Sequence, residues 1–181
     1  YWERLETGEL TREQVMLGRF HEFFESEGLP TDQVKDFNDE YQIRLGDKAF
    51  FCDHGDELVK QLKSAVKQYA VTNGTTVAQE RKLRLSGLDQ LLDGVFISEQ
   101  VGVDKPQKAF FDAVWNEIGS YAPDEVVIVG DSLTSDIRGG KNAEILTCWY
   151  NPDHLPNKIG VTPDCTIDNL QDILSYLDES R

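Results

Sequence analysis

The amino-acid sequence predicts an α/β fold built around a parallel sheet. From residue 55 onward, short apolar runs alternate with segments of helical periodicity. Turn-forming or polar residues follow the apolar runs, as expected at the ends of short strands. Successive strands joined by helices form right-handed βαβ units, whose strands lie parallel with helices on both faces. We therefore expect a parallel sheet covered by helices in the larger, C-terminal part of the chain.

The first fifty residues have a helical pattern without strand-like alternation. Thr11 and Gln14 have the spacing of a capping box, which predicts a helix that Gly28-Leu29-Pro30 ends. A second helix is expected after Thr31, with one apolar face (Val34, Phe37, Tyr41 and Leu45). We interpret the aromatic group as the core of this part; the alternative is that one or two of its members contact a substrate base (Phe20, Phe23, Phe24, Phe37 and Tyr41).

The remaining elements follow in order along the chain. The expected strands are 69–72, 95–97, 125–129, 145–149 and 165–167. The expected helices include one marked by Leu58 and Leu62, one over about 75–86, one opening near Pro106, one over 133–142 and one over 168–179. The change of pattern predicts two parts, a helical segment 1–54 and an α/β core 55–181.

The charge balance argues against several classes of partner. The chain has 181 residues with 33 acidic and 18 basic side chains, a formal net charge of −15. Nucleic acids and anionic membrane surfaces both need a basic face, so neither is expected as a partner. No apolar run approaches the roughly 20 residues that span a bilayer.

Three separated cysteines without a C-x-x-C pair favour a reducing compartment, and the first residues do not form a signal peptide. We therefore expect a cytoplasmic location. No pattern in the sequence sets an oligomeric state.

Ligands of parallel α/β sheets bind beyond the carboxyl ends of the strands, so the residues there carry the functional prediction. After the first strand come Thr72, Asn73 and Gly74. A hydroxyl beside free backbone N–H groups is suited to hold phosphate oxygens. The alternative is an ordinary strand-to-helix turn in which Thr72 caps the next helix.

A lysine follows the second strand, in the sequence Asp104-Lys105-Pro106. Proline restricts the backbone at the start of a helix and helps to aim Lys105. A lysine at this place would neutralise a phosphate and a neighbouring carboxylate. The alternative is a surface lysine in water, which is the usual location of this residue type.

Two acids follow the most continuous apolar strand, Asp131 at its tip and Asp136 in the first turn of the next helix. Their separation lets both side chains face one point. Oxygen ligands at a strand end suit Mg²⁺, which keeps most of its waters and takes few carboxylates. The alternative is that both acids only complement the helix dipole.

Together these segments resemble a known family. Val71-Thr72-Asn73-Gly74, Lys105-Pro106 and Val129-Gly130-Asp131-Ser132 to Asp136 resemble motifs two, three and four of the haloacid dehalogenase-like hydrolase superfamily. The resemblance covers about residues 55–181 and implies a Rossmann-like core, with the helical segment 1–54 as part of an inserted helical cap. The run Tyr1 to Thr11, with Arg19-Phe20, looks more particularly like the pyrimidine 5′-nucleotidase branch.

The resemblance implies a Mg²⁺-dependent phosphomonoester hydrolase with an aspartyl-phosphate intermediate and a nucleoside monophosphate as substrate. Thr72 would bind a phosphoryl oxygen, assisted by backbone groups near Asn73 and Gly74. Lys105 would offset the charge of phosphate and nucleophile, Asp131 would hold the metal, and Asp136 would support the metal or its water shell. The alternative substrates are a sugar phosphate or phosphoglycolate; a halogenated acid suits these residues less well.

One motif of the family is absent. Its members open with a strand ending in D-x-D-x-T/V, which supplies the nucleophile and the general acid/base, and no such segment occurs here. We therefore expect the chain to begin inside the cap and to be inactive alone; the alternative is a non-catalytic phosphate-binding protein. By resemblance the missing strand lies between 69–72 and 125–129. We predict a gap there, or a strand from another molecule.

Overall fold

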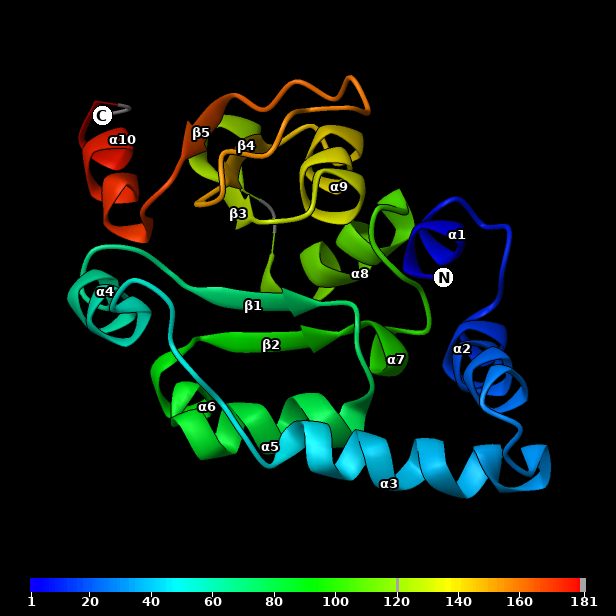
Figure 1. Cartoon of the computed structure of the whole chain (residues 1–181). Coiled ribbons are helices and arrows are strands. Elements are labelled where there is room, and N and C mark those ends of the chain that lie inside the picture. The colour runs from blue at the N-terminus through cyan, green and yellow to red at the C-terminus, as the bar shows by residue number, and fades with distance from the viewer. Residues whose placement is uncertain (120, 180–181) are drawn as a thin grey trace.

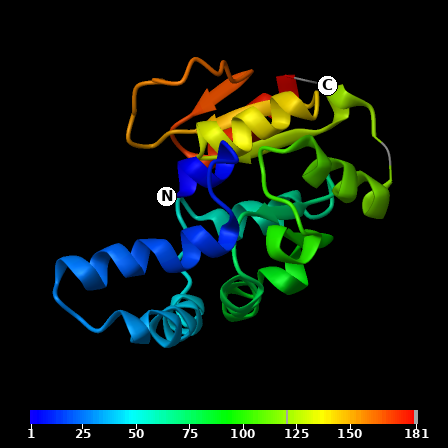
Figure 2. The ribbon, with the colours of Figure 1, turned by 90° about the vertical axis from the view of Figure 1, so that its right-hand side faces the viewer.

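The helical N-terminal part folds as the sequence predicts at its first long helix. The structure, a computed structural model, describes residues 1–119 and 121–179 (Figures 1 and 2). This part contains α1 (Trp2–Glu6), α2 (Arg12–Ser26), a 3₁₀ turn (Thr31–Gln33) and α3 (Val34–Gly46). The predicted capping box is present at the start of α2. The Thr11 hydroxyl accepts a hydrogen bond from the Gln14 backbone, and the Thr11 backbone donates to the Gln14 side chain.

The α/β part contains five strands and the helices that connect them, within the residues described. The strands are β1 (Tyr69–Thr72), β2 (Gly94–Ile97), β3 (Val127–Gly130), β4 (Leu146–Tyr150) and β5 (Cys165–Ile167). The α-helices are α4 (Gly55–Leu62), α5 (Thr76–Ser86), α6 (Leu88–Leu91), α7 (Ser98–Val101), α8 (Lys108–Ile118), α9 (Arg138–Asn142) and α10 (Ile173–Glu179). Each predicted strand is therefore present: β1 and β5 have the predicted bounds, and the ends of the other three strands shift by one or two residues.

The strands form two separate parallel sheets. One pairs β1 with β2, with Val71 opposite Phe96, and the other has the order β3-β4-β5, with Val129 opposite Cys148 (Figure 1). Among the described residues, β1 and β3 are not hydrogen-bonded to each other. The predicted parallel α/β class is confirmed. The absence of pairing between β1 and β3 agrees with the predicted strand order, in which a gap or a strand from another molecule lies between them.

Helix α8 joins the two sheets across this gap. Its residues Phe110, Phe111 and Val114 are buried in one cluster with Ile128 of β3, and Val71 of β1 packs against the same cluster. The neighbouring strand residue Val127 faces the other way, because side chains alternate along a strand. It packs with a second cluster formed from α4, β4, β5 and α10 (Leu58, Cys148, Ile167 and Ile173). Apolar packing thus joins the two sheets, whose neighbouring strands β1 and β3 are not hydrogen-bonded to each other.

The buried face of α3 differs from the prediction. Phe37 and Tyr41 make edge-to-face contacts with Phe20 but stay 41% and 36% exposed. Of the predicted apolar face only Val34 is buried, and the other buried residues of α3 are Asn38, Gln42 and Gly46. The reason is close packing on α5: a Cβ at Gly46 would lie 2.7 Å from the Arg81 Cβ, and Thr75 donates to the Gln42 side chain at 3.0 Å. The interpretation of the aromatic group as a buried core is therefore wrong for most of its members; only Phe24 is buried.

Some helices and strands begin at other residues than the sequence predicts. The segment predicted as the start of a strand at 125 is a 3₁₀ turn (Pro123–Glu125). The helix predicted over 133–142 begins with a π-helical turn (Leu133–Ile137) before α9. Helices α6 and α7 were not predicted, because four residues are too few to show a helical period. Within residues 1–119 and 121–179, no helix has the length and apolar character needed to cross a bilayer.

Candidate active site

A cleft of about 360 Å³ opens at the carboxyl ends of β1 and β3. Its walls come from the two strand ends, the loop before α8, the loop after β3 and helix α1. The lining residues are Trp2, Glu6, Val71, Thr72, Asn73, Lys105, Val129, Gly130, Asp131, Ser132, Ser135 and Asp136. The cleft thus gathers five of the six predicted site residues, all but Gly74, and it lies at the gap between the two sheets.

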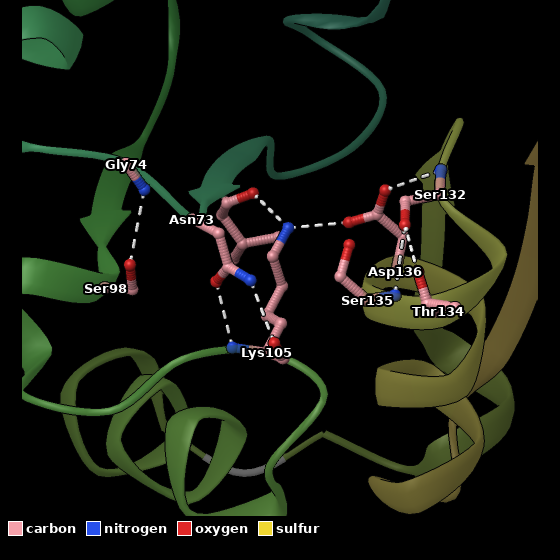
Figure 3. A network of polar contacts seen from close by, with 9 residues as sticks. Asn73, Gly74, Ser98, Lys105, Ser132, Thr134, Ser135 and Asp136 are labelled. Carbon is pink, nitrogen blue, oxygen red and sulfur yellow. Dashed lines mark hydrogen bonds and ion pairs between the residues drawn. The ribbon is translucent and has the colours of Figure 1, made fainter. Parts of the chain in front are cut away.

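Lys105 is the centre of a buried polar network at this cleft (Figure 3). Its ammonium donates to the Val71 carbonyl oxygen at 2.7 Å and to Asp136 Oδ1 at 2.6 Å. The side chains of Lys105 and Asp136 are only 5% and 11% exposed. The alternative of a surface lysine is therefore excluded. The positive charge is held in a fixed place between the ends of β1 and β3.

Asn73 fixes the backbone of Lys105. Its side-chain nitrogen donates to the Lys105 carbonyl at 2.8 Å, and its side-chain oxygen accepts from the Lys105 N–H at 2.9 Å (Figure 3). These two bonds tie the loop after β1 to the loop before α8. The Asn73 side chain is therefore used in positioning Lys105.

Asp136 is held at both oxygens. Oδ1 pairs with Lys105, and Oδ2 accepts from the Ser132 N–H at 3.1 Å. The Ser132 hydroxyl in turn accepts from the Ser135 N–H at 3.1 Å, which caps the helical turn that carries Asp136 (Figure 3). The turn after β3 is thus arranged to present one carboxylate to the lysine.

Asp131 is an exposed carboxylate of the cleft that could meet a cation. Its side chain is exposed at the tip of β3, and its backbone carbonyl accepts from the Trp149 indole N–H at 3.0 Å. Among the described residues no group of three or more histidine, cysteine or acidic side chains is arranged so that it could hold a metal ion. One free carboxylate still fits Mg²⁺, which binds proteins through one or two carboxylates together with waters and substrate phosphates. Because both Asp136 oxygens are engaged, the geometry favours Asp131 as the direct ligand.

Thr72 and Gly74 have different surroundings. Thr72 lines the cleft beside Lys105, as a phosphate-binding hydroxyl should. Gly74 is buried outside the lining, and its N–H donates to the Ser98 hydroxyl at 3.3 Å. A Cβ at Gly74 would lie 2.5 Å from the Gln79 side chain, so this glycine allows a close approach of α5 to the loop. The structure does not bring Gly74 to the predicted substrate position.

Arg12 is a residue of this region that sequence reasoning missed. From the start of α2 it donates to the Gly74 carbonyl at 3.1 Å and also contacts Ser98 and Asp104. The side chains of Arg12 and Asp104 are 19% and 12% exposed. An arginine at a helix start carries no sequence signal for such contacts. They tie the helical N-terminal part to the ends of β1 and β2.

We expect Arg12→Ala to lower the free energy of unfolding by about 1.5–3 kcal/mol, because it leaves the Asp104 carboxylate without its charged partner. The matched control is Arg4→Ala, since Arg4 pairs with Glu9 at the surface with both side chains more than half exposed. Arg4→Ala should lower the free energy of unfolding by less than about 1 kcal/mol. Urea denaturation measures both values, and equal losses would contradict the assigned role of Arg12.

A match to a protein-family model identifies the family of this chain. A family model described as haloacid dehalogenase-like hydrolase matches residues 1–144. The chain belongs to this family, and the resemblance predicted from its three strand-end motifs is confirmed. The match includes the helical N-terminal part as well as the strands that carry the site.

Particular relatives are similar over nearly the whole chain. The HAD-hydrolase YfnB of Bacillus subtilis is 34% identical over 176 residues, 97% of this chain and 74% of its own length. The pyrimidine 5′-nucleotidase PynA of Streptococcus pneumoniae is 34% identical over 183 residues, 99% of this chain and 76% of its own. The pyrimidine 5′-nucleotidase YjjG of Escherichia coli is 30% identical over 176 residues, 97% of this chain and 77% of its own.

Solved structures agree with this placement. YfnB of Bacillus subtilis, solved bound to magnesium, superposes with a TM-score of 0.90 at 33% identity, over 98% of this chain and 77% of that one. A 2-haloacid dehalogenase from Pseudomonas syringae has a TM-score of 0.69 at 23% identity, over 90% of this chain and 69% of that one, a likeness of fold alone.

Proposed function

We propose that this chain provides the phosphate- and metal-binding part of a Mg²⁺-dependent phosphomonoester hydrolase acting on nucleoside 5′-monophosphates. The observation that carries the proposal is the buried ammonium of Lys105, fixed by Val71 and Asp136 at the cleft that Thr72 and Asp131 also line. A fixed positive charge beside a hydroxyl and a free carboxylate suits a phosphate with its divalent cation. The two pyrimidine 5′-nucleotidase relatives support the substrate class.

Each residue then has a separate task. The Thr72 hydroxyl binds a phosphoryl oxygen, and Lys105 balances the negative charge of the phosphate and of the attacking group. Asp136 is a positioning residue, because it holds the Lys105 ammonium. Asp131 would hold Mg²⁺, which when bound supplies positive charge between anions that otherwise repel each other.

The nucleophile in this proposal is an aspartate on a strand lying between β1 and β3. The support is that these two strands leave each other unpaired and that the cleft reaches them at Val71 and Val129. Such an aspartate would form a bond to phosphorus while the alcohol leaves, and water would then release phosphate. Residues 1–181 alone should bind phosphate esters without hydrolysing them.

The test compares residues 1–181 with the same residues joined to a strand carrying D-x-D-x-T/V. We expect phosphate release from nucleoside monophosphates by the extended form only. In that form Asp131→Asn or removal of Mg²⁺ by a chelator should lower the rate by about 100-fold or more, the usual size of one electrostatic contribution. A colorimetric phosphate assay measures the rates, with Asp124→Asn as a charge-matched surface control. Undiminished turnover after either change would contradict the assignment of Asp131.

A second substrate class has its own support. A glyceraldehyde 3-phosphate phosphatase of Methanopyrus kandleri is 33% identical over 126 residues, 67% of this chain and 54% of its own length. Release of phosphate from sugar phosphates, with none from nucleotides, would establish that class instead. Binding of phosphate esters with no release from any extended form would support a non-catalytic phosphate-binding protein.

A further inference from the structure

Helix α1 contributes two residues to the lining of the cleft. Trp2 and Glu6 lie one helical turn apart on it, so both side chains face the same way, and both line the cleft with Thr72 and Lys105. Both residues lie in the run Tyr1 to Thr11, which resembles the pyrimidine 5′-nucleotidase branch. Neither side chain has a task in binding phosphate or metal as proposed above.

Glu6 has a polar atom without a partner. Its Oε2 is buried, and no hydrogen bond reaches it from the described residues. Burial raises the pKa of Glu6 and the negative charge of Asp136 adds to this rise, while the nearby Thr134 and Ser135 side chains oppose it. These side chains lie beside the carboxylate, but its Oε2 still lacks a hydrogen-bond donor. A buried acceptor without a donor costs free energy, so a ligand that supplies an N–H or O–H at this point gains what the free protein lacks.

The negative charge of Glu6 also indicates which part of a phosphate ester, the phosphate or the leaving group, would bind beside it. A carboxylate near Asp136 repels a phosphate, and the phosphate has Lys105 and Thr72 to bind it. This charge argues for Glu6 beside the neutral, leaving-group part of a phosphate ester.

Trp2 is held in a defined position by Arg19. The Arg19 guanidinium lies 5.7 Å from the centre of the Trp2 ring, and 4.5 Å and 5.2 Å from the rings of Phe20 and Tyr41. These contacts fix a guanidinium among three aromatic rings and so restrain the indole. At 37% exposed, Trp2 keeps part of its surface free for a flat partner.

We propose that Trp2 and Glu6 form the leaving-group subsite of the cleft, with the indole stacking on a nucleobase and Glu6 accepting a hydrogen bond from the nucleoside. The inference rests on the proposed function, since it names the specificity residues of that same cleft. It requires a ligand that has both a flat ring and a hydrogen-bond donor. A sugar phosphate has only the donors, and a simple aryl phosphate has only the ring.

The test measures dissociation constants by calorimetry, with Mg²⁺ present, for four probes: uridine 5′-monophosphate, ribose 5-phosphate, phenyl phosphate and inorganic phosphate. We expect the nucleotide to bind about tenfold more tightly than either of the two partial analogues. In the Trp2→Leu variant, uridine 5′-monophosphate should bind no more tightly than ribose 5-phosphate. In the Glu6→Leu variant, it should bind no more tightly than phenyl phosphate. Equal affinities for the nucleotide and either analogue in the unsubstituted protein would overturn the inference.

Inorganic phosphate separates loss of the subsite from loss of the fold, because it lacks the nucleoside that the subsite would hold. Its dissociation constant should rise by no more than about twofold in either variant, and loss of the Glu6 charge should lower it, which shows that Lys105 and Thr72 remain in place. Glu3→Gln is the matched control on the same helix: Glu3 is exposed and outside the lining, so nucleotide affinity should be unchanged. An equal loss from Glu3→Gln and Glu6→Leu overturns the subsite. If none of the four probes binds the unsubstituted protein, the proposed function itself fails.

Discussion

Lys105→Met is expected to lower the free energy of unfolding by about 3–5 kcal/mol, the usual loss when one partner of a buried ion pair is removed. The substitution leaves the Asp136 carboxylate, 11% exposed, without its cation, and it leaves the Val71 carbonyl without its 2.7 Å donor. Methionine has nearly the volume of the lysine stem, so lost packing contributes little. Urea denaturation followed by circular dichroism measures the change.

A double-mutant cycle tests whether the loss comes from the pair. Asp136→Asn keeps an acceptor for the Ser132 N–H but leaves Lys105 as an unpaired buried charge. The double variant contains neither charge and should recover much of the stability lost in the single variants, a coupling of about 1–3 kcal/mol. The control is Lys35→Met, whose pair with Asp39 is 74% and 56% exposed and should contribute less than about 1 kcal/mol. Additive single losses would rule out a coupled pair.

Much of the site was predictable because local signals coincide at the strand ends. An apolar run that stops at a polar residue marks both a strand and its carboxyl end. Lys105, Asp131 and Asp136 could thus be placed at one edge of the sheet before any geometry was known. The contacts that fix this region could not be predicted from the sequence. Asn73 is hydrogen-bonded to Lys105 across 32 residues of sequence, and Arg12 to Asp104 across 92 residues. Nothing in the nearby sequence specifies such distant contacts.

The fold shows the same limit. Helix α3 has a clear apolar face in sequence, yet it buries a face that contains Asn38, Gln42 and Gly46. A helical period shows which residues share a face, whereas burial depends on the neighbouring element. Here α5 takes the face where a glycine lets it approach closely. Glu6 illustrates the opposite case, a surface residue type whose proposed role is based on the cleft that it lines.

Gly130→Ala is expected to lower the free energy of unfolding by about 3 kcal/mol or more and to disorganise the cleft. A Cβ at Gly130 would lie 2.4 Å from Cβ, Cγ and Oδ2 of Asp136. Asp136 cannot yield cheaply, because its two oxygens are held by Lys105 and by the Ser132 N–H. Overpacking alone costs about 1–3 kcal/mol, and displacement of Asp136 would also break the buried ion pair. Urea denaturation measures the stability, and calorimetry with inorganic phosphate measures the site.

The background variant Lys105→Met separates these two contributions. Without the lysine the ion pair no longer exists, so Gly130→Ala should then cost only the overpacking, about 1–3 kcal/mol. Gly55→Ala is the control: it stands at the start of α4, where a Cβ would lie 3.4 Å from the Leu170 side chain, an ordinary contact. Its effect should stay within about 1 kcal/mol. If Gly130→Ala costs the same with and without Lys105, then the glycine serves packing alone. Close approach of β3 to Asp136 would then not be what aims the carboxylate at the lysine.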